Sequence, residues 1–293
     1  MRRLSYTSLM YGLAKSERSD VQKTGGNMIT SASNSRMKNL SALLKKSKER
    51  KKENIFVAEG IKMFLEAPGD WVLQVYVAES FLCEKENGIL LKGYNYEVVS
   101  DSVFTAVSDT QTPQGIMTVL RMPEYTLPQL LNGVKTHLLV LESIQDPGNL
   151  GTMFRAGEGA GISGIIMNHT TVDLFNPKTV RATMGSIYRV PYLVTKNLED
   201  TVMELKEKGV SFYAAHLKGT AEYDSCDYNK QTAFLIGNEG NGLSDMAAGL
   251  ADTRIRIPME GRVESLNAAV SASVLMYECS RQRRHSTTYE NLV

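Results

Sequence analysis

The second half of the chain alternates short apolar runs with longer segments of helical periodicity. The apolar runs are HLLVLESI (137–144), GIIMN (164–168), VSFYAAH (210–216), TAFLI (232–236) and TRIRIPM (253–259). Continuous apolar runs bounded by turn residues are typical of strands buried on both faces, as in parallel sheets covered by helices. The alternation therefore predicts an α/β domain with a mainly parallel sheet over residues 136–293.

The first half predicts a smaller α/β unit over residues 28–121. Strand-like pieces occur at IFVAEG (55–60), VLQVYVAE (72–79), YEVVS (96–100) and TPQGIMTVL (112–120), with helical patterns between them. RMPEYTLPQLLNGVK follows and carries two prolines, so a linker over residues 122–135 that includes a short helix is expected. The two halves therefore form separate domains in this interpretation.

Residues 1–27 are basic at first but contain no apolar core of signal-peptide length. We expect this segment to be a disordered tail. Met28 is then the natural start of the protein, or at least the start of its ordered structure.

The bulk composition excludes several classes of protein. The net charge is +1, so any nucleic-acid surface must come from local clustering of charge. Three cysteines without a C-x-x-C spacing favour a reducing, cytoplasmic compartment, and the four histidines lack any zinc-binding spacing. No apolar run approaches the ~20 residues of a membrane span. We therefore expect neither a metal site nor a membrane segment.

A basic run lies near the start of the first domain. Eight of the 17 residues from Arg36 to Lys52 are Lys or Arg, with Leu40, Leu43 and Leu44 at helical spacing among them. Taken alone, such a run is more often a solvated helix face than a surface that contacts phosphates. The run itself does not separate the two interpretations.

Residues 159–164 read GAGISG and match the G-x-G-x-x-G pattern of dinucleotide-binding turns. That pattern has meaning only where it follows a strand and opens a helix. Here it follows a helical segment and precedes the strand GIIMN, and no acidic residue lies about 20 residues further on. We interpret it as a helix exit, with Gly159 or Gly161 as the left-handed residue that ends the helix.

Three other segments join glycine to polar side chains at the ends of predicted strands. They are NLGTMFRA (149–156), FLIGNEGNGL (234–243) and IPMEGRVESLNAAVSASV (257–274). Each segment alone is an ordinary connection, with Ser265, for example, as a possible helix cap. Ligands of open α/β sheets bind beyond the carboxyl ends of the strands, so the three segments together predict one pocket.

These three segments resemble the signature motifs of the SpoU (TrmH-like) RNA 2′-O-ribose methyltransferases of the SPOUT superfamily, in the family's order. The first domain resembles the family's small substrate-binding domain, which is similar to ribosomal RNA-binding proteins, with FVAEG and TPQGI as weaker marks. The resemblance implies an S-adenosylmethionine-dependent enzyme, a trefoil-knotted fold, a homodimer and an RNA substrate. A knot is otherwise almost absent among protein folds.

The resemblance also assigns roles to individual residues. By position it implies cofactor binding by Gly237, Ile257 and Leu266, and catalytic roles for Asn149, Arg155, Glu239, Ser265 and Asn267. The basic run then becomes an RNA-binding surface, represented by Arg36, Lys38, Lys45, Lys46 and Arg50.

Methyl transfer to a ribose hydroxyl requires alignment of the reactants and removal of a proton. The family assigns Arg155 as the base or as the group that orients the hydroxyl through a substrate phosphate. Arginine normally stays protonated, so we expect Arg155 to be essential and leave the proton acceptor open. Ribosomal RNA is the favoured substrate because of the first domain. Transfer RNA, or a catalytically idle RNA-binding or assembly protein, are the alternatives.

Overall fold

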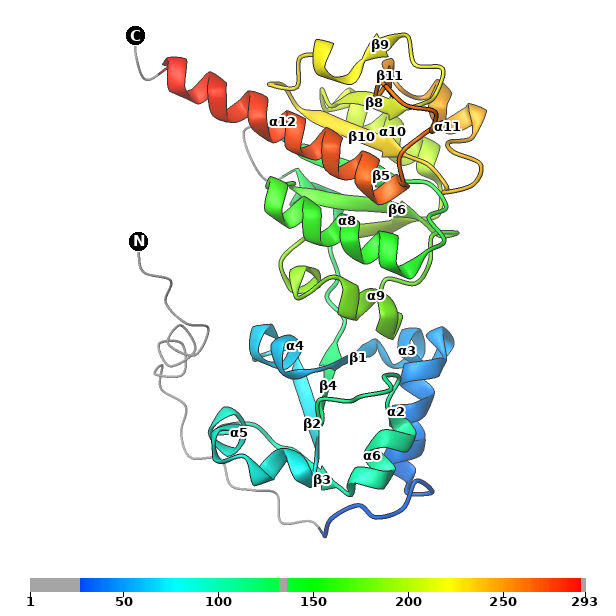
Figure 1. Cartoon of the computed structure of the whole chain (residues 1–293). Coiled ribbons are helices and arrows are strands. Elements are labelled where there is room, and N and C mark those ends of the chain that lie inside the picture. Colours follow the sequence, from blue (N-terminus) through cyan, green and yellow to red (C-terminus); the bar gives the residue numbers. More distant parts are fainter. Residues whose placement is uncertain (1–26, 132–135, 291–293) are drawn as a thin grey trace.

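Two sheets, one in each half of the chain, organise the molecule (Figure 1). The structure is a computed structural model that describes residues 27–131 and 136–290. The expected tail over residues 1–27 lies outside the described residues except for its last position.

The N-terminal half is a four-stranded sheet in the order β1-β4-β2-β3, flanked by helices. Strands β2 and β3 run parallel, whereas β1–β4 and β2–β4 pair antiparallel. All four strands predicted from the sequence are present. The elements of this half are α2 (Ser35–Lys45), α3 (Ser47–Glu53), β1 (Ile55–Glu59), α4 (Ile61–Glu66), β2 (Val72–Ala78), η1 (Ser80–Cys83), α5 (Lys85–Leu90), β3 (Tyr96–Val99), α6 (Asp101–Val107) and β4 (Ile116–Arg121).

The C-terminal half is a seven-stranded sheet in the order β7-β6-β5-β10-β8-β11-β9. Every neighbouring pair is parallel, which confirms the predicted α/β class with a parallel sheet. Its elements, with the short helix that precedes them, are α7 (Leu127–Leu130), β5 (His137–Leu141), α8 (Pro147–Ala160), β6 (Gly164–Asn168), α9 (Pro177–Ala182), η2 (Ser186–Tyr188), β7 (Tyr192–Thr195), α10 (Leu198–Glu207), β8 (Ser211–Ala215), β9 (Ala221–Glu222), η3 (Tyr223–Ser225), β10 (Thr232–Ile236), α11 (Asp245–Gly249), β11 (Thr253–Arg256) and α12 (Ala268–Glu290).

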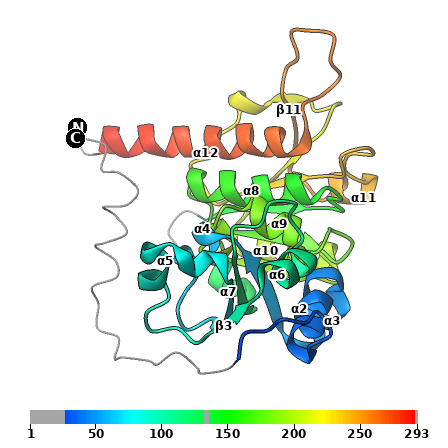
Figure 2. The same cartoon turned by 60° about the horizontal axis from the view of Figure 1, so that its bottom comes forward.

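Helices cover both faces of this sheet because successive strand residues point to opposite sides. In β5, Leu139 and Leu141 join the apolar cluster beneath α8 and α12. Leu138 and Val140 join the cluster beneath α10 and α11. Helices α8 and α12 lie side by side on one face, as both views show (Figures 1 and 2).

Helix α8 differs from its prediction at the start and agrees at the end. It begins at Pro147 rather than near Leu150, because the Asp146 side chain caps it by accepting a hydrogen bond from the Asn149 N–H at 2.8 Å. Gly161 ends it in the left-handed conformation, with φ +74°. The GAGISG segment is therefore a helix exit, as the sequence predicted.

Two strands were not predicted. β7 and β9 are short strands at the two edges of the large sheet, with four and two residues. Strands this short give too few residues for an alternating pattern to be recognised.

The two halves meet in what we call the interdomain joint. One apolar cluster crosses it and includes Phe56, Met63 and Leu120 of the N-terminal half. The ring of Phe56 lies 4.7 Å from that of Phe175, centroid to centroid. Among the described residues, three ion pairs also cross the joint: Arg50–Asp173, Asp109–Arg181 and Glu66–Arg189.

Candidate active site

Three loops gather at the carboxyl edge of the large sheet. They follow β5, β10 and β11, and comprise residues 142–146, 237–244 and 257–267. Because all the strands are parallel, these loops leave the sheet on the same side. The third loop extends as an arch beyond the start of α12 (Figure 2). The structure thus brings the three sequence motifs to one edge.

A chain of amide hydrogen bonds connects the three motifs. Asn267 Nδ2 donates to Asn149 Oδ1 at 3.0 Å, and Asn149 Nδ2 donates to Glu239 Oε1 at 2.9 Å. Asn149 lies in the first turn of α8, and the Asn267 side chain accepts from the N–H of Ala269 at the start of α12. Side chains separated by up to 118 positions in the sequence therefore form one polar cluster.

Glu239 is the acceptor on which this cluster depends. Besides Asn149, the backbone N–H groups of Gln145 and Asp146 donate to its two carboxylate oxygens at 3.0 and 3.1 Å. Partial burial alone would raise the pKa of Glu239, but these three hydrogen bonds together hold the pKa below its usual value. Glu239 is therefore ionised, and its hydrogen bonds connect the 237–244 loop with the 142–146 loop.

Arg155 stands apart from this cluster. It lies six residues beyond Asn149 on α8, which is about 9 Å further along the helix axis. Its side chain is exposed and makes no hydrogen bond or ion pair with any described residue. Ser265 is likewise exposed and without such a contact in the described chain. Both groups are free to meet a ligand.

The three residues expected to bind a cofactor lie on the same loops. Gly237 is buried at the end of β10, where a Cβ would overlap the backbone of Gly242 and Leu243. That close approach lets Asn238 and Gly242 exchange two backbone hydrogen bonds of 3.0 and 2.9 Å. Ile257 and Leu266 are half-buried at the two ends of the third loop.

The structure adds supporting residues that the sequence reasoning missed. Glu142 is buried and accepts hydrogen bonds from the N–H and Oγ of Ser244 at 2.8 and 2.7 Å. Asn238 donates to the carbonyl of Ser143 at 2.9 Å and accepts from the N–H of Gly240. A signal for Glu142 was present in the sequence, as a lone carboxylate that ends an apolar strand.

The basic run forms α2 and α3 on the N-terminal half. Four of its five proposed RNA contacts are exposed: Arg36, Lys38, Lys45 and Lys46. Arg36 also pairs with Glu97 at 2.7 Å.

The proposed RNA-binding role of Arg50 is wrong. Its side chain is only 3% exposed, donates to the carbonyls of Leu43 and Leu44, and pairs with Asp173 across the joint. A guanidinium with all these partners is a structural group, because its hydrogen bonds are already made.

Other features bear on the function classes considered above. All three cysteines are free. Across residues 27–131 and 136–290, no group of three His, Cys, Asp or Glu side chains has the arrangement of a metal site. In the same ranges, no helix combines the length and the apolar character that crossing a membrane requires.

Comparison with known proteins identifies both halves. The model of the SpoU rRNA Methylase family matches residues 136–277, and the model of the MRM3-like substrate binding domain matches residues 34–118. The chain is 36% identical over 255 residues to the 23S rRNA (guanosine(2553)-2′-O)-methyltransferase RlmP of Bacillus subtilis, covering 85% of this chain and 97% of RlmP.

Solved structures agree with these matches. An AdoMet-bound rRNA methyltransferase from Sinorhizobium meliloti is 31% identical, with a TM-score of 0.76 over 88% of this chain and 97% of that one. The SpoU methyltransferase AviRb of Streptomyces viridochromogenes, in complex with AdoMet, is 26% identical, with a TM-score of 0.79 over 86% and 98%. The predicted family is confirmed: the chain belongs to the SpoU family of methyltransferases.

Proposed function

We propose that this protein transfers the methyl group of S-adenosylmethionine to a ribose 2′-hydroxyl in ribosomal RNA. The observation that carries the proposal is the hydrogen-bonded cluster of Asn149, Glu239 and Asn267, which joins the three family motifs at one sheet edge. Arg155 lies beyond that cluster, and its cation is unpaired within the part of the chain that the structure describes. The similarity to RlmP, named as a 23S rRNA 2′-O-methyltransferase, supports the same reaction here.

The loops at this edge fit S-adenosylmethionine, which is bound in two of the similar structures. Gly237, Ile257 and Leu266 would hold it, together with the backbone of the 238–242 turn. The open space around Gly242 and Gly261, where a Cβ would meet no atom within 4 Å, leaves backbone accessible to a ligand. When bound, the cofactor supplies an electrophilic methyl group on a sulfonium.

The chain's own residues align the acceptor. The hydroxyl oxygen must lie in line with the methyl group, and its proton must leave. Arg155 orients the ribose through an adjacent phosphate, since a guanidinium stays protonated. The ionised Glu239 keeps Asn149 and the 142–146 loop in place. Asn267 sets the position of the third loop through its hydrogen bond to Asn149, and the hydroxyl of the exposed Ser265 on that loop is available to cofactor or ribose.

The N-terminal half supplies the RNA-binding surface in this proposal. The boundaries are those expected from the sequence, with residues 28–121 binding RNA and residues 136–293 performing the transfer. Exposed Arg36, Lys38 and Lys45 on α2, and Lys46 between α2 and α3, give the phosphate contacts. The match of residues 34–118 to a substrate-binding domain supports this role.

We further propose a homodimer, a trefoil knot in the C-terminal half and a cytoplasmic location, as the family resemblance implies. Val270 and Tyr277 on α12 are large apolar side chains that remain about half exposed. They lie seven residues apart, so they share one face of α12, the helix that packs against α8. A second copy that covers this face would bury them. The free cysteines fit a reducing compartment.

The test is to map 2′-O-methyl groups in total RNA from cells with and without the gene. We expect one ribosomal RNA position to lose its methyl group. S-adenosylmethionine should also raise the melting temperature of the purified protein, because a ligand of the native state stabilises it. Loss of a methyl group from transfer RNA instead would identify transfer RNA as the substrate. No binding of S-adenosylmethionine would favour an idle RNA-binding scaffold.

A further inference from the structure

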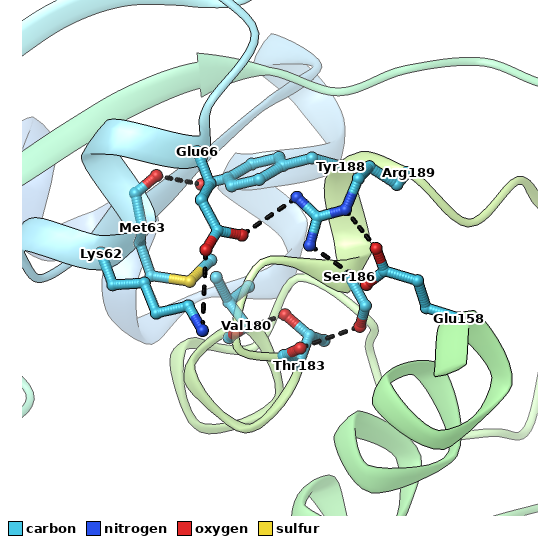
Figure 3. A network of polar contacts seen from close by, with 9 residues as sticks. All are labelled: Lys62, Met63, Glu66, Glu158, Val180, Thr183, Ser186, Tyr188 and Arg189. Atoms are coloured by element: carbon cyan, nitrogen blue, oxygen red, sulfur yellow. Dashed lines mark hydrogen bonds and ion pairs between the residues drawn. The ribbon is translucent and has the colours of Figure 1, made fainter. Parts of the chain in front are cut away.

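Arg189 lies at the interdomain joint between two carboxylates that belong to different halves (Figure 3). Its Nε and Nη2 atoms donate to the two oxygens of Glu158 on α8, and the Nη2–Oε2 distance is 3.1 Å. Its Nη1 donates to Oε2 of Glu66, the last residue of α4, at 3.0 Å. Lys62, one turn earlier on α4, pairs with the other oxygen of Glu66 at 3.6 Å.

The turn that carries Arg189 is built to receive Glu66. Gly185 has φ +98°, and a Cβ there would overlap Oε2 of Glu66, so both the backbone and the space require glycine. Inside the turn, Ser186 Oγ donates to the carbonyl of Thr183 at 2.8 Å. The buried hydroxyl of Tyr188 reaches across the joint and donates to the carbonyl of Met63 at 3.0 Å. The turn is therefore fixed to α4 at several points.

Glu158 lies only three residues after Arg155 on α8, which is about 4.5 Å along the helix axis. Arg189 consequently links α4 of the RNA-binding half to the part of α8 that carries Arg155. Without the guanidinium, Glu66 and Glu158 would face the same site as like charges, with Lys62 paired to one of them only. Repulsion between these carboxylates would loosen the connection between the halves.

We propose that Arg189 is a positioning residue that fixes the distance from the RNA-binding half to Arg155 and thereby determines which nucleotide is methylated. This proposal rests on the proposed RNA methyl transfer. RNA held on α2 and α3 presents a given ribose to Arg155 only if the two halves keep one relative position. The apolar cluster and two other ion pairs also hold the halves together, and the forked contacts of Arg189, two to Glu158 and one to Glu66, tie α4 to the segment of α8 that carries Arg155.

The test is Arg189→Ala in the full chain, assayed on a ribosomal RNA transcript with every methylated position mapped. We expect the affinity for S-adenosylmethionine to stay within about twofold, and kcat/KM on the transcript to fall about tenfold, since small misplacements are costly in such reactions. Methyl groups should also appear at neighbouring nucleotides. Lys206→Ala, which breaks an ion pair of 2.8 Å within the C-terminal half, is the matched control and should retain one product.

A second variant and a distance measurement keep the proposal open to refutation. Glu66→Gln removes the charge that pairs with Arg189 across the joint and with Lys62 within α4, and leaves the fork on Glu158. It should therefore spread the products even if Arg189→Ala folds poorly. Spin labels on exposed Cys83 and on Met203→Cys of α10, with Cys226→Ser, report the distance between the halves. We expect the distribution of distances between the two labels to be broader in both variants than in the wild type.

Unchanged products together with an unchanged distance distribution would overturn the role of Arg189. A wild-type protein that methylates no RNA would instead overturn the proposed function, and the distance measurement would still show whether Arg189 holds the halves together.

Discussion

At the carboxyl edge of the large sheet, one carboxylate accepts three hydrogen bonds from neutral donors, and the nearby Arg155 has no hydrogen-bond or ion-pair partner among the described residues. At the interdomain joint, three arginines each have a carboxylate across the boundary. Arginine side chains thus occur in two environments, one without a partner among the described residues and one paired with a carboxylate. Arg155 keeps its hydrogen-bonding capacity for a ligand, whereas Arg50, Arg181 and Arg189 use theirs within the protein. Burial and pairing together separate these arginines from Arg36, which pairs with Glu97 but stays exposed and can still meet RNA.

The largest expected effect comes from removing the unpaired cation at the edge. Arg155→Ala should lower kcat on RNA by about 10²–10³-fold, the cost of losing a group that acts on the reacting centre. Affinity for S-adenosylmethionine and the melting temperature should stay near wild type, because Arg155 is exposed and makes no hydrogen bond or ion pair with a described residue. Single-turnover methylation and calorimetry measure these quantities. Near-normal turnover would show that pairing does not identify the functional arginine.

At the joint, Arg50→Ala should act on stability instead. It leaves Asp173 without its cation and frees two buried carbonyl groups, which should cost about 3 kcal/mol in the free energy of unfolding. Urea denaturation measures the change. Lys51→Ala, at the exposed neighbouring position, is the control and should be close to neutral. An equal loss in both variants would contradict the structural role of Arg50.

Lys45 and Lys46 belong to the same basic run as Arg50 but are exposed, so replacing them should affect RNA binding and not stability. Replacing Lys45 and Lys46 by Gln should weaken RNA binding and reduce the slope of log K against log salt by about 1 per lysine. Stability should hardly change. Lys196→Gln with Lys208→Gln in the C-terminal half is a control of equal charge. If both pairs reduced the slope alike, the RNA-binding surface would not be confined to α2 and α3.

The smallest expected effect is the pH dependence of the contribution that Glu239 makes to the free energy of unfolding. Its pKa is lowered in the folded protein, so its contribution to stability is present above the unfolded-state pKa, about 4.3, and is lost as the pH falls through the folded value. The stability difference between wild type and Glu239→Gln should therefore shrink on acidification below that pH. Because the side chain is exposed, the change will be modest. A difference independent of pH would mean that the carboxylate is not the acceptor.

The fold was largely predictable from the chain because buried parallel strands leave long apolar runs, such as HLLVLESI. The three motif loops were predictable for the same reason, since strand ends fix where loops emerge. The bonds between Asn149, Glu239 and Asn267 were not, because hydrogen bonds over such sequence distances leave no local pattern. Arg50 shows the limit most clearly. It lies in a run of exposed cations, and no local pattern reveals its ion pair with Asp173, 123 residues later.

The apolar cluster shared by the two halves also has a consequence for biosynthesis. Phe56, Leu120 and Met122 belong to one cluster with Tyr188 and Tyr192, which are made some 70 residues after Leu120 and Met122. At about 5–20 residues per second, roughly ten seconds separate the completion of β4 from the arrival of β7. During that interval the nascent N-terminal half exposes an apolar surface, to which chaperones can bind.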